Sequence, residues 1–307
     1  MANIISAGIG TENAVFPEEL TRELFNGVAG KSALARVSRQ RPISFVGNTD
    51  FVFSMDSEAD IVAENGAKSN GGGAFTPVHI VPVKFEYGTR VSDEFIYASE
   101  EQRLETLRTF MEGAARKFAR GFDIAAIHGL NPRTMTASAV VGDNHFDSKA
   151  AATPMVPTEG FDVALSNAIA WVNNEGYEVT GLALAPMFSA GIGAPNSKGI
   201  VNYPELSFGA NPETFRGMAL GVSNTVSMAA EGVTTLDGAI VGDFENAFRW
   251  GYARDIDFEV IRYGNPDNNT TLGDLRGHNQ VYLRCEAYIG WGILNANSFN
   301  RVTVTTA

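Results

Sequence analysis

The sequence predicts an α+β fold in which long helices are flanked by β-rich regions. Apolar residues alternate with polar ones in TDFVFSMDS and in VPVKFEYGTRVS, the period of a half-buried strand. Residues 99–121 follow a helical period, and the last third of the chain is again rich in strand-forming residues. Strands, then helices, then strands along one chain is the order typical of the α+β class.

The composition is that of a folded protein. The chain has 307 residues, of which 44% are hydrophobic and 19% charged. Its net charge of −12 argues against general nucleic-acid binding, because contact with phosphate backbones needs a basic surface. Cys285 is the single cysteine, which excludes an internal disulfide and favours folding in a reducing cytoplasm. We find no apolar run long enough to span a membrane and expect no secretion signal.

The first elements predict segments that reach beyond a core. The first forty residues indicate an extended arm with one short helical stretch, PEELTRELF. The alternation at Phe51, Phe53 and Met55, and again from Val83 to Tyr87, predicts the two strands of a long hairpin joined by a glycine-rich loop. An isolated hairpin is marginal in water, so we expect this one to pack on another molecule.

The clearest helix covers residues 99–121. Ser99 with Gln102 forms a capping box, and the buried stripe is Leu104, Leu107, Met111, Ala114, Phe118 and Phe122. A second helix is predicted over 159–173 and a buried strand over 182–186. The chain is then loop-rich to about residue 216, and strands close the fold.

No pattern for a cofactor, a metal or an enzyme emerges. The stretch ENGAKSNGGGAF (64–75) precedes a strand and therefore lacks the helix N-terminus that binds phosphate. GAPNSKG (193–199) lacks the second glycine of a phosphate loop. The histidines, at 79, 128, 145 and 278, show no metal-ligand spacing. His278 lies near Asp274, but a histidine in a polar loop is more often simply solvated.

Six segments together resemble the major capsid protein of tailed bacteriophages, which has the Hong Kong ninety-seven-like fold that encapsulins share. They are PEEL, ADIVAENGAK, FARGFDIAAIHGLNP, RGMALGVSN, GAIVGDFENAFRWGYARDIDFEVI and VYLRCEAYIGWGILNANSFNRVTV. The resemblance implies an N-arm (1–44), an E-loop (45–91), a P-domain with its spine helix (92–131) and an A-domain (132–236). Residues 237–307 are then expected to return mainly to the P-domain as closing strands.

The function that the resemblance implies is structural and not enzymatic. Copies of the chain would self-assemble into hexamers and pentamers that form an icosahedral virion shell around double-stranded DNA, without sequence-specific binding. Assembly would take place in the host cytoplasm, and scaffolding, portal and decoration proteins are the further partners that the family suggests. The arm itself is an alternative to a separate scaffolding protein.

The resemblance also implies three residues for a covalent cross-link between subunits. Lys68 falls at the position of the family's E-loop lysine, Asn279 at that of the asparagine, and Glu286 at that of the glutamate that accepts the proton. Such an isopeptide bond requires a deprotonated lysine and releases ammonia. Neighbouring aromatic residues would desolvate Glu286 and suit it to this role.

Two alternatives to this site stay open. Many members of the family never cross-link, and Glu286 could simply pair with an arginine in its sheet. Other asparagines near Asn279 could also take its place, namely Asn268, Asn269, Asn295, Asn297 and Asn300. For the whole chain, the alternatives are an encapsulin shell, a phage tail or baseplate protein, and a soluble enzyme that uses His278 or the glycine-rich loops.

Overall fold

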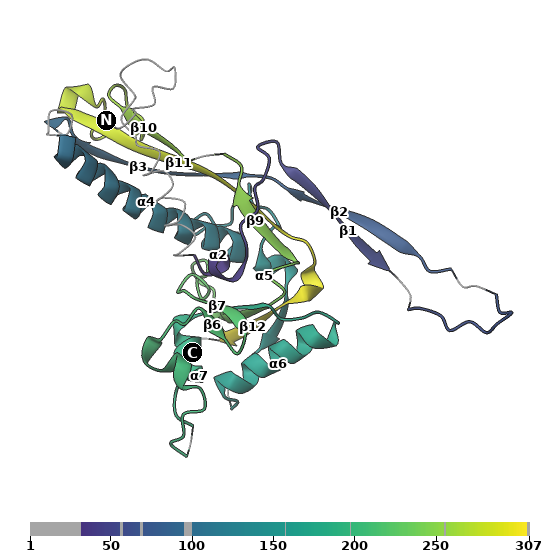
Figure 1. The fold of residues 1–307 in the computed structure, drawn as a ribbon. Helices are drawn as coiled ribbons and strands as arrows, with labels where there is room; N and C mark the ends of the chain where they lie inside the picture. The colour runs from purple at the N-terminus through teal and green to yellow at the C-terminus, as the bar shows by residue number, and fades with distance from the viewer. Residues whose placement is uncertain are drawn as a thin grey trace.

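The chain folds around one long helix and two β-sheets, and a two-stranded hairpin projects from this body (Figure 1). The predicted α+β order of elements is confirmed. The computed structural model describes residues 32–55, 58–67, 70–94, 100–156, 158–196, 198–254 and 256–305. The helical stretch PEELTRELF and the cap residue Ser99 lie outside these ranges.

Most elements lie where the sequence predicts them, with two exceptions. Residues 186–192 form a helix where the end of a strand and a loop-rich stretch were predicted, and residues 73–80 form a strand where a glycine-rich loop was predicted. The helices are α2 (Ala33–Val37), α4 (Glu100–His128), α5 (Phe146–Lys149), α6 (Phe161–Asn174) and α7 (Pro186–Ile192). The strands are β1 (Asn48–Met55), β2 (Gly73–Ile80), β3 (Val83–Ser92), β4 (Ala151–Pro154), β5 (Gly181–Leu184), β6 (Thr214–Phe215), β7 (Met218–Val222), β8 (Thr235–Gly242), β9 (Phe248–Tyr252), β10 (Asp257–Ile261), β11 (Gln280–Ile293) and β12 (Phe299–Thr305).

Helix α4 is longer than predicted. Its 29 residues give a rod of about 43 Å. The predicted stripe from Leu107 to Phe122 is buried, but the helix continues to His128. Its last turns are buried on all sides, so their sequence lacks the amphipathic period by which the first turns were recognised. Gly129, with φ +67°, ends the helix in a conformation that glycine adopts without strain.

Helix α4 packs on a four-stranded sheet in which β11 is the central strand. β10 and β3 pair with the first part of β11 on either side, and β9 pairs with its last part. Phe122 of α4 contacts Trp250 of β9 and Trp291 of β11, with ring centroids 5.2 and 5.7 Å apart. The face of the sheet under the helix is therefore apolar, and the other face carries the charged side chains.

A six-stranded sheet forms the second half of the body. Its strand order is β4-β12-β8-β5-β7-β6, so β8 and β12 from the last third of the chain lie beside strands from its middle. Helix α6 packs against β8 and β12. Aromatic rings of four phenylalanines fill the junction near α5 and β9, namely Phe146, Phe244, Phe248 and Phe299.

The hairpin exists, but the strand pairing that we predicted for it is wrong. β1 pairs with β2, from Asn48 opposite Ile80 to Met55 opposite Gly73. The segment that begins at Val83 pairs with β11 instead. Residues 73–80 begin with glycine and contain Pro77, and both types are depleted in strands. Pro77 is tolerated because each strand of a two-stranded ribbon is an edge strand.

The base of the arm is fixed to both larger sheets. The backbone N–H groups of Arg41 and Ile43 donate to the carbonyls of Trp250 and Tyr252, at 2.8 and 3.1 Å. This segment passes so close to β9 that a Cβ atom on Gly251 would lie 1.8 Å from the Arg41 carbonyl oxygen. A short helix, α2, precedes it and packs against β7 and β5.

Candidate functional site

Glu286 lies on the charged face of the four-stranded sheet. Its Oε1 atom is 2.7 Å from Lys84 Nζ and 3.5 Å from Arg284 Nε. The hydrogen bond to Glu286 raises the pKa of Lys84 above its usual range. Cys285 and Trp291 are buried on the α4 side of the sheet, because successive residues of a strand point to opposite faces. Tyr282 and Tyr288, two of the neighbours expected to desolvate Glu286, share its face of the strand. The carboxylate of Glu286 itself pairs with two cations, as in the alternative where it pairs within the sheet.

Asn279 lies at the start of the same strand, in an exposed turn. It adopts the left-handed conformation with φ 52°, which asparagine tolerates better than most residues. Its carbonyl oxygen accepts a hydrogen bond from the Asp93 backbone at 2.9 Å. The residue is exposed, so its carboxamide is accessible from outside the chain.

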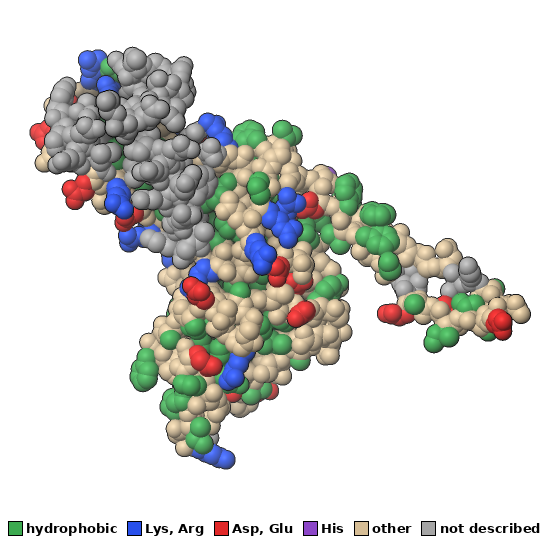
Figure 2. All heavy atoms as spheres, viewed as in Figure 1, with side chains coloured by type: hydrophobic (Ala, Val, Ile, Leu, Met, Phe, Trp, Pro, Cys, Tyr) green, Lys and Arg blue, Asp and Glu red, His purple; other side chains and the backbone are tan. Residues whose placement is uncertain are grey.

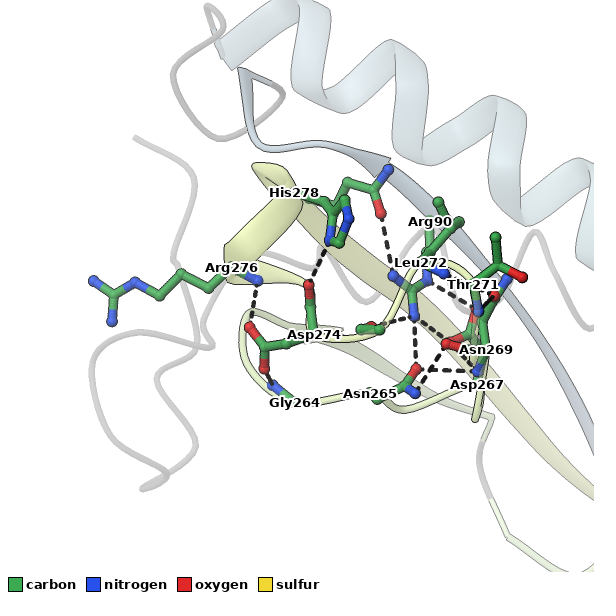
Figure 3. Close-up of polar contacts among 12 residues, drawn as sticks. Arg90, Gly264, Asn265, Asp267, Asn269, Thr271, Leu272, Asp274, Arg276 and His278 are labelled. Atoms are coloured by element: carbon green, nitrogen blue, oxygen red, sulfur yellow. Dashed lines mark hydrogen bonds and ion pairs between the residues drawn. The ribbon is translucent and has the colours of Figure 1, made fainter.

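Arg90 organises the loop that leads to Asn279 (Figure 3). Its guanidinium group donates to the Asp267 carboxylate at 2.5 and 2.9 Å and to Asn265 Oδ1 at 2.7 Å. It also donates to the Gly273 carbonyl at 2.8 Å and to Gln280 Oε1 at 3.2 Å. The hydrogen bond from Arg90 lowers the pKa of Asp267. The guanidinium group of Arg90 thus holds both ends of the polar loop (264–277) in place.

His278 does not share a site with the Asp274 carboxylate. Its Nδ1 atom lies 3.1 Å from the Asp274 backbone carbonyl oxygen. The Asp274 side chain accepts instead from backbone N–H groups of Gly264 and Arg276, each within 3.0 Å (Figure 3). His278 is exposed, which agrees with the interpretation of a solvated loop histidine.

Asn279 and Glu286, the two cross-link candidates that the structure describes, are not brought together within one copy of the chain. Asn279 and Glu286 are seven residues apart along β11, a distance of roughly 24 Å in a strand. Lys68 lies outside the described residues. A site that used Asn279 and Glu286 together would therefore have to take them from different copies.

The hairpin carries an apolar face that its own chain leaves uncovered. Phe51, Phe53, Met55 and Phe75 lie on one face, because Phe53 stands opposite Phe75 and side chains alternate along each strand. Their exposed fractions are 67%, 48%, 76% and 70%. Figure 2 shows hydrophobic side chains gathered along the projecting hairpin. Exposed apolar surface of this extent is typical of an interaction site.

Three polar residues that no sequence motif indicated meet where α4 contacts the six-stranded sheet; two of them are buried and Asp147 is partly exposed. His128, Asp147 and Asp237 each bring one ligand-type atom to within 4.8 Å of the others. Asp123 and His128 are the polar residues of the otherwise apolar run FDIAAIH, which was the available signal. Asp147 and Asp237 stand in unrelated segments, so only the fold could bring them to His128.

Solved structures resemble this chain over nearly its whole length. A structure from Mycobacterium phage Ogopogo matches with a TM-score of 0.75 and 30% sequence identity, over 90% of this chain and 92% of that one. A structure from Gordonia phage Cozz matches with a TM-score of 0.68 and 26% identity, over 91% and 86% of the two chains. The chain belongs to the family of tailed-bacteriophage major capsid proteins.

The capsid protein has the Hong Kong ninety-seven-like fold that was expected. The capsid of a native GTA particle shares this fold at 13% identity, with a TM-score of 0.61 and 91% of each chain covered. Neither a protein-family model nor a curated protein matches the sequence. The capsid protein is thus a structural component of a virion shell. Among its described residues, no helix has the length and apolar composition needed to cross a bilayer.

Proposed function

We propose that the capsid protein self-assembles into hexamers and pentamers that close an icosahedral shell around phage double-stranded DNA. The observation that carries this proposal is the apolar face of the projecting hairpin, which would lie over a neighbouring copy as the E-loop. β1 and β2 each extend about 27 Å, so the hairpin reaches well past the body of its own chain. Burying each large apolar side chain contributes about 1.5–3 kcal/mol, and a shell repeats this contact at every subunit.

The domain assignment is part of the same proposal. We assign residues 1–44 to the N-arm, 45–91 to the E-loop, 92–131 to the P-domain with its spine helix, 132–236 to the A-domain, and 237–307 mainly to P-domain closing strands. The net charge of −12 suits a shell that encloses DNA without binding it tightly. The fully buried Cys285 thiol is compatible with assembly in the host cytoplasm, where scaffolding and portal proteins would be partners.

The hairpin contact is tested by adding charge to one of its two faces. Phe53→Asp with Phe75→Asp should abolish assembly into large particles, because two carboxylates would have to be buried in the contact. The matched control, Ser54→Asp with Thr76→Asp, adds the same charge to the opposite face and should assemble. Sedimentation velocity and electron microscopy measure assembly, and circular dichroism verifies the fold of both variants. Assembly of the Phe53/Phe75 variant would contradict the proposal.

We further propose that mature shells are locked by isopeptide bonds between Lys68 of one copy and Asn279 of another. The neutral Lys68 amine attacks the Asn279 carboxamide carbon, the new amide forms, and ammonia leaves. Glu286, as proton acceptor, would come from a third copy, given its separation from Asn279 along β11. It would have to give up part of its pairing with Lys84 and Arg284, which is the cost of this arrangement.

Denaturing gels test the cross-link. Mature wild-type shells should give ladders of covalent oligomers, and Lys68→Arg should give monomer only, because a guanidinium keeps the charge but is a poor nucleophile. Asn279→Asp should also remove the ladder, whereas Asn268→Asp, in the same loop region, should keep it. A single monomer band from fully matured wild-type shells would exclude the bond, while the shell function itself would still stand on the assembly test.

A further inference from the structure

A network of polar side chains, mostly buried, connects the end of α4 with the six-stranded sheet. His128, the last residue of α4, places Nε2 2.9 Å from the Thr225 carbonyl oxygen and Nδ1 2.8 Å from Asp147 Oδ2. The Thr225 carbonyl can only accept, so Nε2 carries a hydrogen, and an ionised Asp147 accepts from Nδ1 as well, which corresponds to the imidazolium form of the ring. Burial lowers the pKa of His128, but the hydrogen bond and charge of Asp147 outweigh it and raise that pKa overall.

Arg301 of β12 joins two carboxyl groups at the same place. Its Nη1 atom lies 2.9 Å from Asp147 Oδ1 and 2.8 Å from Asp237 Oδ1. Its Nη2 atom donates to the Asp147 backbone carbonyl at 3.0 Å. Asp147 belongs to α5 and Asp237 to β8, so four elements meet in this cluster. His145, just before α5, is the next titratable group beside it, and the exposed Asp143 interacts with His145.

Two buried atoms of the cluster, Asp237 Oδ2 and Arg301 Nε, have no hydrogen-bond partner among the described residues. A buried carboxylate oxygen without a hydrogen-bond partner raises the free energy of the folded state, whereas a protonated carboxyl group is neutral and can donate to a nearby carboxylate. Burial, followed by the charge of Asp147, raises the pKa of Asp237 to about 8. Asp147 is more exposed, and its contacts with His128 and Arg301 lower its pKa despite partial burial.

We propose that Asp237 carries a proton at neutral pH and that this proton stabilises the packing of α4, α5 and the six-stranded sheet against one another. We call the contact formed by His128, Asp147, Asp237 and Arg301 the proton-dependent joint. Loss of the proton to solvent leaves two carboxylates beside one guanidinium and one imidazolium in a mostly buried space. Repulsion between Asp147 and Asp237 then opposes the packing of β8 against α5. The loosened packing also affects the arm, because Thr225 contacts both His128 and Asp123. The Thr225 hydroxyl donates to the Asp123 carboxylate, which also accepts hydrogen bonds from Ser32 and Ala33.

A divalent cation is the other occupant that an imidazole and two carboxyl groups suggest. Here the Arg301 guanidinium lies between Asp147 and Asp237, where such a cation would bind. The geometry therefore favours a protonated Asp237 over a bound metal ion, and the effect of added metal on stability is measured as part of the test.

The direction of the pH dependence follows from Asp237. Its pKa in the folded chain, about 8, lies above the usual 3.8, so the folded state binds more protons than the unfolded state between these values. The stability due to the proton is complete below about pH 4 and is lost as the pH rises through about 8. His128, with its raised pKa, acts in the same direction.

The test compares the thermal midpoint of the full-length protein at about pH 6 and about pH 9. The wild type should lose roughly 5–10 °C over this range, and Asp237→Asn, which keeps the neutral shape, should lose much less. Asp143→Asn, an exposed carboxyl close by, should keep the wild-type loss. Equal losses in the wild type and in Asp237→Asn would overturn the proposal.

Two further measurements do not depend on the Asn variant folding well. The infrared carbonyl band of protonated carboxyl groups in the wild type should lose amplitude between about pH 7 and about pH 9, and a constant amplitude would overturn the proposal. Zinc chloride should leave the midpoint unchanged. A rise that EDTA reverses and that His128→Asn removes would assign the cluster to a metal ion and contradict the proton-dependent joint.

Discussion

Asp123 brings a carboxyl group into the middle of the core, on a helix that is otherwise apolar there. Four donors meet its two oxygens: the hydroxyl groups of Ser32 and Thr225 and the backbone N–H groups of Ala33 and Leu34. Burial raises the pKa of Asp123, while these hydrogen bonds favour its ionised form. The side chain thereby fixes the first turn of α2 and the 223–226 turn to α4.

Replacing Asp123 should therefore destabilise the chain far beyond the loss of one side chain. Asp123→Ala leaves several buried donors without an acceptor, and we expect a loss of about 3 kcal/mol or more in the free energy of unfolding. Urea denaturation followed by circular dichroism measures it. Asp60→Ala, at an exposed carboxyl near the hairpin tip, should change stability by less than about 0.5 kcal/mol. Equal small effects in both variants would show that the donors find water instead.

For single residues, the sequence predicted which face of a strand a side chain occupies better than which side chains it contacts. The alternation of β11 was readable, and it already separates Glu286 from Cys285. What it does not contain is the identity of the cross-strand neighbours. Lys84 is 202 positions away from Glu286 and reaches it only because β3 and β11 pair in one particular register. The joint at Asp237 depends on tertiary packing in the same way.

Elements are joined in this fold by close backbone approaches that tolerate glycine alone. Gly251 in β9 faces the Arg41 carbonyl, whereas Gly113 in α4 has no atom within 4 Å of its missing Cβ position. The same substitution should thus have opposite effects at the two sites.

We expect Gly251→Ala to destabilise the chain by at least about 2 kcal/mol, because the methyl group overlaps backbone that has to move. Gly113→Ala should stabilise it by about 0.5–1 kcal/mol, the usual gain from alanine inside a helix. Thermal denaturation of the two variants against the wild type measures both signs. In the Gly251 variant, hydrogen exchange should accelerate at Arg41 and Ile43, and unchanged protection there would contradict the clash.

Which elements could be predicted depended on where each is buried. α6 and the exposed part of α4 have one apolar side each, so their period revealed them. The end of α4 is buried all round, and β2 contains glycine and proline, so neither shows a diagnostic pattern. The pairing of β3 with β11 connects distant parts of the chain, which a local pattern cannot specify.

The whole molecule consists of a packed body and a ribbon that its own chain hardly supports. The hairpin forms a separate two-stranded sheet, while the core joins α4 to both larger sheets. Asp50 at its base forms an ion pair with Arg249 at 2.7 Å, which fixes the direction in which the ribbon leaves the body. Folding and assembly should therefore be separable properties.

Replacing residues 51–77 by a short glycine-serine linker should leave a folded monomer. The remaining ends, Asp50 and Val78, stand opposite each other in the ladder, so they are only about 5 Å apart and a few residues close the gap. We expect the thermal midpoint of the body to change by less than about 4 °C, because the removed part is mostly exposed. Differential scanning calorimetry and sedimentation velocity report stability and mass. Shells formed by this variant would show that the hairpin is dispensable for assembly.

Strand β11 gives the body a mechanical property as well. It extends for 14 residues from the turn at Asn279 to the buried Ile293, and it is hydrogen-bonded to β3 and β10 and then to β9. A tensile force applied at the exposed end acts along the strand and loads these hydrogen bonds in shear, so they must break together and not one after another. A neighbouring molecule bound to the Asn279 turn thus transmits tensile force along β11 directly to the core that contains the tryptophans. The strand connects the edge of the molecule to its centre as a single load-carrying element.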